Sequence, residues 1–240
     1  MSGQRFRLDL LRPLSYIGAL LLLSACPRRP EALVPVALEP ADRDSAVAWV
    51  RTTVPPRRTL MRFRWRYQDE RVTYAGRGTS RIAPPDSLRF DYAGPLGMGA
   101  GAAVLLGDSV AWADPAANFE ALVPAIPMLW ASLGVIRPPA AGARVFRREE
   151  QGIDARRTIW RFVEAADTLD YVLTDGFARE LQAEWRRRGT VVARSTTQYV
   201  AGSPVSARID FPEGPARFDL TVVAVDTLAV FTPALWRGRR

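Results

Sequence analysis

The side chains that most often carry catalysis are scarce in this 240-residue sequence. It contains no histidine and a single cysteine, Cys26, which excludes Ser-His-Asp and Cys-His arrangements and histidine-based metal sites. Two carboxylate pairs remain, Asp167 with Asp170 and Glu149 with Glu150, and such pairs can act as acid and base when their pKa values differ. Both pairs lie near predicted turns and strand ends, where solvated charge is the simpler interpretation. We therefore predict no enzymatic activity, no metal and no cofactor, with a carboxylate enzyme as an alternative.

Cys26 has the surroundings of a modification site. Three arginines precede an apolar run at 14–23, which ends in Leu23-Ser24-Ala25-Cys26. This order is that of a secretory signal peptide, and the run is shorter than the roughly 20 apolar residues that span a bilayer. Its end resembles the lipobox of bacterial lipoproteins, in which the cysteine receives a lipid and a peptidase cuts before it. The resemblance implies a signal peptide at 1–25 and acyl chains such as palmitate on Cys26; a buried free cysteine and a transmembrane anchor are the alternatives.

The composition beyond this leader is typical of a folded globular protein. Apolar residues make up 48% of the chain and charged residues 24%, and the formal net charge of +8 is carried by arginine without lysine. Residues 27–40 hold four prolines, which disfavour helix and sheet and suit an extended tether. No second linker follows. We therefore predict a lipidated, proline-rich tether at 26–41 and one domain at 42–240, which begins with a short helix within 42–54.

After Pro56 the apolar residues recur with a period of two. In 61–67 four apolar residues alternate with three arginines, which predicts a strand with one buried and one solvated face. Gly76 and Gly78 indicate a bulge or bend. Turn signals recur about every 8–12 residues, the rhythm of an all-β sheet or barrel. Strands are predicted at 61–67, 71–82, 88–92, 98–106, 109–113, 143–149, 156–164, 168–174, 178–188, 190–200, 204–211 and 216–225.

One segment in the middle of the chain has a helical period instead. Between Asn118 and Val135 the apolar residues are spaced by three and four, which places them on one face of a helix. Pro124 and Pro127 lie inside the segment, and internal prolines kink or split a helix. We therefore predict two short helical pieces with a shared apolar face: Phe119, Leu122, Val123, Ile126, Leu129, Trp130 and Leu133.

This order of elements resembles the LolA/LolB-like lipoprotein-carrier superfamily. The local resemblance is strongest in Ser87-Leu88-Arg89-Phe90, in Gly94-Pro95-Leu96-Gly97 and in the turn and strand at 107–112. It implies a mainly β (α+β) fold: a curved, antiparallel, incomplete β-barrel of about 11 strands with a helical lid and a short N-terminal helix. In that family the concave face holds acyl chains.

The apolar strand positions and the helix face together form a candidate lipid site. Aromatic residues bury a large area each, so a groove lined by them would hold acyl chains well, and a dry core packed against the helix is the alternative. The candidate residues are Phe63, Trp65, Tyr67, Tyr74, Phe90, Tyr92, Leu96, Met98, Phe119, Leu122, Ile126, Trp130 and Leu133.

The function implied is a monomeric, membrane-anchored lipoprotein of the bacterial envelope. Its cavity would bind acyl chains or lipidated proteins in lipoprotein or lipid transport to the outer membrane, and its partners would be membrane lipid, other lipoproteins or a periplasmic carrier. The alternative is a non-catalytic envelope scaffold or sensor with the same fold. The anchor would sit in the outer membrane and face the periplasm, because Pro27 is not the aspartate linked with inner-membrane retention.

Arginine-rich runs at 62–66 and 186–188 allow a further interpretation. Arginines interleaved with aromatic residues occur in proteins that bind single-stranded nucleic acid. Export with lipidation excludes nucleic acid as a partner. A solvated strand face and contact with anionic headgroups remain as the two alternatives.

Overall fold

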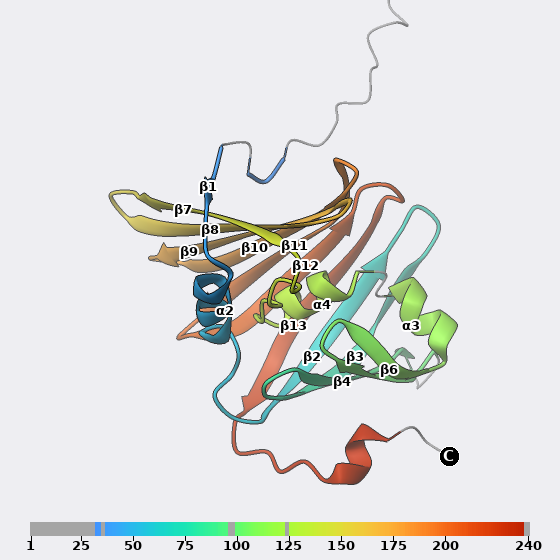
Figure 1. Ribbon diagram of the computed structural model, residues 1–240. Helices are drawn as coiled ribbons and strands as arrows, with labels where there is room; N and C mark the ends of the chain where they lie inside the picture. The colour runs from blue at the N-terminus through green and yellow to red at the C-terminus, as the bar shows by residue number, and fades with distance from the viewer. Residues whose placement is uncertain (1–31, 35–36, 96–98, 123–124, 238–240) are drawn as a thin grey trace, which may run out of the picture. The chain divides into compact units, whose positions relative to one another are not determined.

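The computed structural model describes residues 32–34, 37–95, 99–122 and 125–237. These residues belong to one compact unit, Ala32–Arg240. In this part of the chain, antiparallel strands pair into a single sheet, and three short α-helices accompany it (Figure 1). Cys26 and the leader lie outside the described residues.

The sheet contains thirteen strands among the described residues, in the order β1-β7-β8-β9-β10-β11-β12-β13-β2-β3-β4-β5-β6. All of the pairs are antiparallel, and β1 and β6 are its two edges, so the sheet is open. The strands are β1 (Glu39–Pro40), β2 (Thr59–Gln68), β3 (Thr73–Ala83), β4 (Ser87–Ala93), β5 (Gly101–Leu106), β6 (Ser109–Asp114), β7 (Arg144–Gln151), β8 (Ala155–Glu164), β9 (Asp167–Gly176), β10 (Arg179–Arg187), β11 (Thr190–Val200), β12 (Ser203–Phe211) and β13 (Ala216–Asp226).

The period-two pattern predicts the sheet correctly. In β2, Met61, Phe63 and Trp65 are buried on what we call the inner face, while the intervening arginines are exposed on the outer face. Each of the twelve predicted ranges matches one strand, from β2 to β13. The two-residue strand β1 is too short to produce a pattern, and it brings the number of strands to thirteen, where about eleven were expected.

The helices also form where the sequence predicts them. Helix α2 (Arg43–Arg51) begins after Asp42, whose side chain accepts a hydrogen bond of 2.8 Å from the Ser45 amide. The central segment forms α3 (Ala116–Leu122) and α4 (Ile126–Ser132), two short helices as expected. Pro127 lies in the first turn of α4, where the missing amide hydrogen costs nothing.

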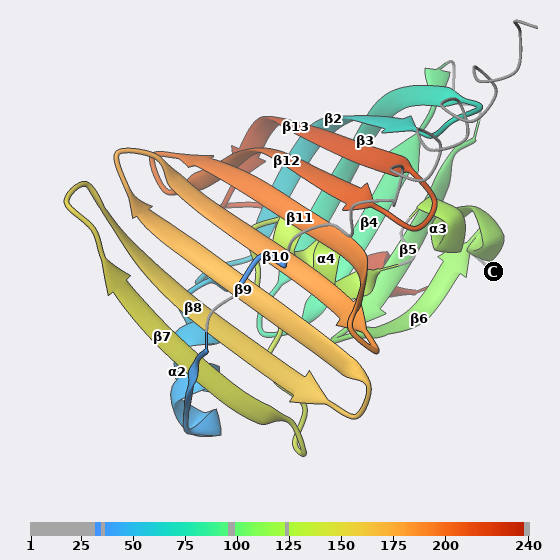
Figure 2. The ribbon, with the colours of Figure 1, turned by 90° about the horizontal axis from the view of Figure 1, so that it is seen from above.

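The sheet bends around α4, which lies on its inner face (Figure 2). On one side α4 contacts β10, β11 and β12. On the other side the Trp130 indole nitrogen donates a 2.9 Å hydrogen bond to the Gly107 carbonyl, at the turn between β5 and β6. These strands stand far apart in the sheet order, so only a curved sheet can touch α4 from both sides. The predicted incomplete barrel with a helical lid is confirmed.

Gly76 and Gly78 serve the core rather than a bulge. The β2–β3 ladder runs without a register shift, and Gly76 pairs with Trp65 and Gly78 with Phe63. A β-carbon at Gly78 would lie 2.4 Å from the Phe63 ring, and one at Gly76 would lie 2.7 Å from the Trp65 ring. Glycine is therefore needed because the two rings lie over the backbone of β3.

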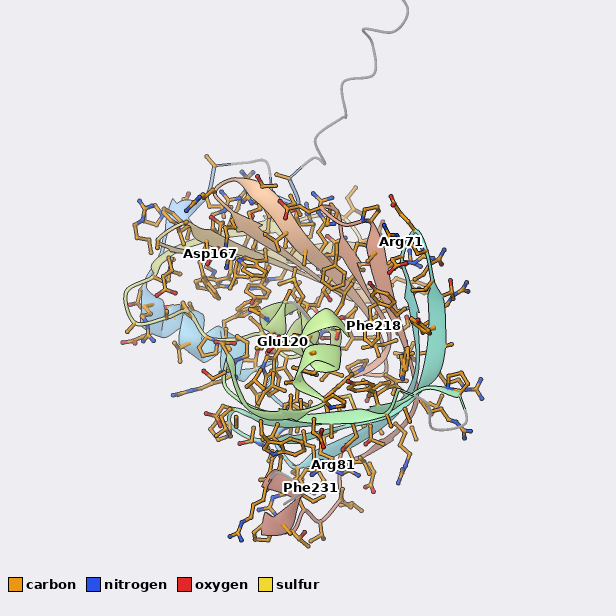
Figure 3. All side chains as sticks on the ribbon, turned by 90° about the vertical axis from the view of Figure 1, so that its right-hand side faces the viewer. Arg71, Arg81, Glu120, Asp167, Phe218 and Phe231 are labelled. Carbon is orange, nitrogen blue, oxygen red and sulfur yellow. The ribbon has the colours of Figure 1, made fainter. Side chains whose placement is uncertain are left out.

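Both ends of the described chain cover parts of the outer face. Residues 32–34 and 37–40, which we call the strap, cross β8 and β9 before β1 pairs with β7. After β13 the chain reaches η3 (Pro233–Trp236), and the Leu235 carbonyl accepts a 2.6 Å hydrogen bond from Arg89 of β4. Figure 3 shows Phe231 of this C-terminal segment below the sheet, near Arg81. The outer face of β2 and β3 lies between the two covered regions in the strand order.

Candidate functional site: the inner face and its helical cover

Most of the predicted lipid-site residues gather in one apolar cluster on the inner face. Phe63 and Trp65 of β2 meet Phe90 and Tyr92 of β4, and all four are buried. Phe119 of α3 and Trp130 and Leu133 at α4 are buried in the same cluster, while Tyr67 and Ile126 are partly buried against it. The sequence pattern therefore selected residues that the fold brings together.

The rings in this cluster are in direct contact. Phe63 and Phe90 stack with their centroids 5.2 Å apart, and Phe119 of α3 lies 6.5 Å from Phe90. Distances and tilts of this kind are those of stabilising aromatic pairs. In the conformation described, the helices occupy the space that an acyl chain would take. A ligand on this face would have to displace them.

Four of the predicted residues are not placed in the cluster. Tyr74 is opposite Tyr67 in the ladder, but its side chain is 55% exposed because it lies beside the β2–β3 turn, outside the cluster. Leu96, Met98 and the side chain of Leu122 lie outside the described residues.

Aromatic residues of the strands after the helical segment complete the cluster, and none of them was among the predicted lipid-site residues. Trp160 and Phe162 of β8, Tyr171 of β9 and Phe218 of β13 are all buried on the inner face. Figure 3 shows Phe218 directed into the interior, on the same side as α3 with Glu120. The same alternation in β8 and β13 carried this signal, but only the strands before the helical segment were considered as lining.

Few hydrogen bonds from side chains of the sheet hold α4 and its C-terminal turn. The Thr197 hydroxyl of β11 donates a 2.8 Å bond to the Ala131 carbonyl, and the Tyr199 hydroxyl donates a 3.2 Å bond to the Gly134 carbonyl. Burial raises the pKa of Tyr199 to about 12, so this hydroxyl keeps its proton and remains a donor at neutral pH. We call these two bonds the α4 latch.

Neither carboxylate pair can work as an acid and base couple. Neighbouring side chains in a strand point to opposite faces, as do side chains three residues apart, which separates both pairs. Each carboxylate instead meets arginine: Asp167 accepts from Arg187 at 3.0 Å, and Glu150 accepts from Arg157 at 2.7 Å. Asp170 was expected to be solvated, but it is fully buried on the outer face of β9.

Asp170 belongs to a buried charge cluster beneath the strap. Its carboxylate pairs with Arg161 and Arg186, while the fully buried Glu184 of β10 pairs with Arg186 and Arg194. The strap closes this cluster from above, because the Leu33 amide donates to Glu184 and Arg161 donates a 2.8 Å bond to the Val34 carbonyl. Val34 itself packs between Ile159 and Val172.

The described residues lack both a candidate metal cluster and a helix that could span a membrane. They contain no cluster of three acidic, cysteine or histidine side chains that could hold a metal ion. In the same part of the chain, no helix has the length and apolar character needed to cross a membrane.

The fold can be compared with that of known proteins. No protein-family model matches the sequence, and no curated protein matches it. A LolA superfamily protein from Nitrosomonas europaea superposes with a TM-score of 0.56 at 10% identity, covering 82% of this chain and 98% of its own. This chain has a LolA-like fold.

A second solved structure agrees with this assignment. A domain from Vibrio parahaemolyticus, assigned to outer membrane lipoprotein sorting, superposes with a TM-score of 0.51 at 10% identity, covering 80% of this chain and 97% of its own. These matches confirm the fold that the resemblance implies. At this level of identity, the similarity extends to the fold alone.

Proposed function

We propose that the protein is a lipid-anchored envelope lipoprotein that binds an acyl chain on the inner face of its sheet. The observation that carries the proposal is the broad apolar inner face, which is covered by two helices of only seven residues each, α4 over β10 to β12 and α3 beside β5 and β6. To admit a hydrocarbon chain, this cover would have to move and uncover the fully buried Met128, Leu129 and Trp130 of α4, and it would then expose an aromatic surface.

A structural neighbour supports the same proposal. It is described as an outer membrane lipoprotein-sorting protein domain. In this reading, Cys26 holds the protein to the outer membrane on the periplasmic side, and the cargo is a phospholipid or the acyl chains of another lipoprotein. No catalytic step is required, because the inner face offers packing and the carboxylates are engaged by arginines.

The α4 latch provides a test of this function. A Thr197→Val variant keeps the shape of the side chain but removes the hydrogen bond to Ala131, which contributes about 0.5–1.5 kcal/mol. If α4 must leave for an acyl chain to enter, the full-length Thr197→Val variant, anchored on vesicles, should take up more photoactivatable palmitate than the unaltered protein. The expected increase is roughly three- to ten-fold. Mass spectrometry should locate the cross-links at Phe90 and Phe119.

The matched control is Thr196→Val, one residue away on the outer face of the same strand. It should leave palmitate uptake unchanged. Cross-links confined to the outer face, or uptake that does not respond to Thr197→Val, would contradict the acyl-binding function. That result would favour the scaffold alternative, in which the ring contacts of the inner face are a permanent core.

A further inference from the structure

Four arginines on the outer face of β2 and β3 make no ion pair within the described residues. They are Arg62, Arg64 and Arg66 of β2 and Arg77 of β3, and all four are exposed. Arg64 pairs directly with Arg77 across the ladder, so two like charges face each other. Such a pair is unfavourable unless an anion is shared between the two side chains.

On the neighbouring strands β4, β12 and β13, outer-face arginines are matched with carboxylates. On β4, Arg89 and the neighbouring Arg81 share Asp91, and on β12 and β13, Arg208 and Arg217 share Asp219. Because Asp91 and Asp219 already hold two arginines each, neither neutralises Arg64 or Arg77. Asp226 of β13 lies two positions from the ladder partner of Arg62 and accepts a hydrogen bond from the Leu228 amide.

Arg62, Arg64 and Arg77 line a surface groove of about 540 Å³, which we call the arginine groove; Asp91, already paired with Arg81 and Arg89, lines it too. This volume lies within the range of about 300–1,000 Å³ that is typical of ligand sites. Thr79 and Ala93 form part of its walls, together with Val223, which projects where the β13 register shifts and is 55% exposed. The groove therefore combines unneutralised positive charge with an exposed apolar side chain.

The strands also exclude one class of polyanion. A single-stranded nucleic acid would need aromatic side chains for base stacking beside the arginines. Phe63 and Trp65, which alternate with these arginines, are buried on the opposite face of the sheet. Phosphate groups with apolar material next to them match the groove better.

We propose that the arginine groove binds the anionic phospholipid headgroups of a bilayer. Arg64 and Arg77 would share one phosphate and relieve their mutual repulsion, with Arg62 beside it and Val223 at the acyl boundary. The site lies on the face opposite the acyl-binding surface. It rests on the proposed function only in that the Cys26 anchor brings the groove close to a membrane.

The test uses the full chain with Val223→Cys, which carries an environment-sensitive fluorophore, on phosphatidylcholine vesicles with or without phosphatidylglycerol. We expect quenching by a headgroup-labelled lipid only when phosphatidylglycerol is present. The triple variant Arg62→Gln, Arg64→Gln, Arg77→Gln should abolish this difference. Each arginine removed should weaken the binding constant for the anionic vesicles about five-fold. The control variant Arg147→Gln, Arg156→Gln, Arg157→Gln removes the same charge from paired arginines of β7 and β8, and should keep the difference.

Three outcomes would overturn the proposal. They are equal quenching on both vesicles, an equal loss in the two triple variants, and a response to inorganic phosphate alone, which would indicate a small-anion site. The mass of the labelled chain checks the anchor separately, because an acylated Cys26 leaves one reactive thiol and a free Cys26 leaves two. Failure of the anchor is thus distinguished from failure of the groove.

Discussion

Asp170 and Glu184 are unusual because they are fully buried on the side of the sheet that faces away from the core. Removing one partner of a buried ion pair leaves the other charge uncompensated, which costs more than the pair itself contributes. The arginines around them are partly exposed: the Arg161 side chain is 21% accessible to solvent and the Arg186 side chain 17%. Solvent therefore moderates the cost without removing it.

We expect Asp170→Asn to lower the free energy of unfolding by about 3 kcal/mol, the lower end of the range for a broken buried pair. Urea denaturation of the purified protein would measure it. The matched control is Asp167→Asn in the same strand, whose ion pair with Arg187 is exposed on both sides. Surface pairs contribute about 0–1 kcal/mol, so equal losses in the two variants would refute the role given to the buried cluster.

At the scale of elements, alternation was enough to predict strands β2 to β13 and to assign their two faces. It could not predict that part of the outer face is covered, because a period of two marks which residues share a face and says nothing about what lies over it. Asp170 was consequently expected in solvent. The aromatic residues chosen in β2 and β4 do meet, whereas Tyr74 fits the pattern but lies beside the turn, beyond the helices.

The packing of rings against β3 gives a prediction for an element. We expect Gly78→Ala to destabilise the protein by about 1–3 kcal/mol, the usual cost of overpacking, because the new methyl group would meet the Phe63 ring and the Asp91 carbonyl. Thermal unfolding would measure the change. Gly142→Ala, where a β-carbon would meet no atom within 4 Å, should be close to neutral. If Gly78→Ala left the stability unchanged, β3 would have to shift away from the Phe63 ring at little cost.

At the scale of the whole molecule, the anchor remains a prediction from sequence. We expect Cys26→Ser to abolish labelling of the protein by a radioactive or alkyne-tagged palmitate precursor in a bacterial host, and to move the protein out of the fraction sedimented with membranes. Sedimentation of the full chain and its variant would measure this. Retention of label in Cys26→Ser would place the lipid elsewhere, and retention in membranes without label would indicate an uncut leader.

The strap has a consequence for the order in which the molecule forms. Leu33 and Val34 bond to Glu184 and Arg161, partners that lie 151 and 127 residues further along the chain. The ribosome therefore completes the strap long before β8, β9 and β10 exist to receive it. Contacts of such long sequence separation form late, because the loop between them must close first. The first described residues are thus among the last to settle, and the outer face of β8 and β9 stays uncovered at least until Glu184 has been added.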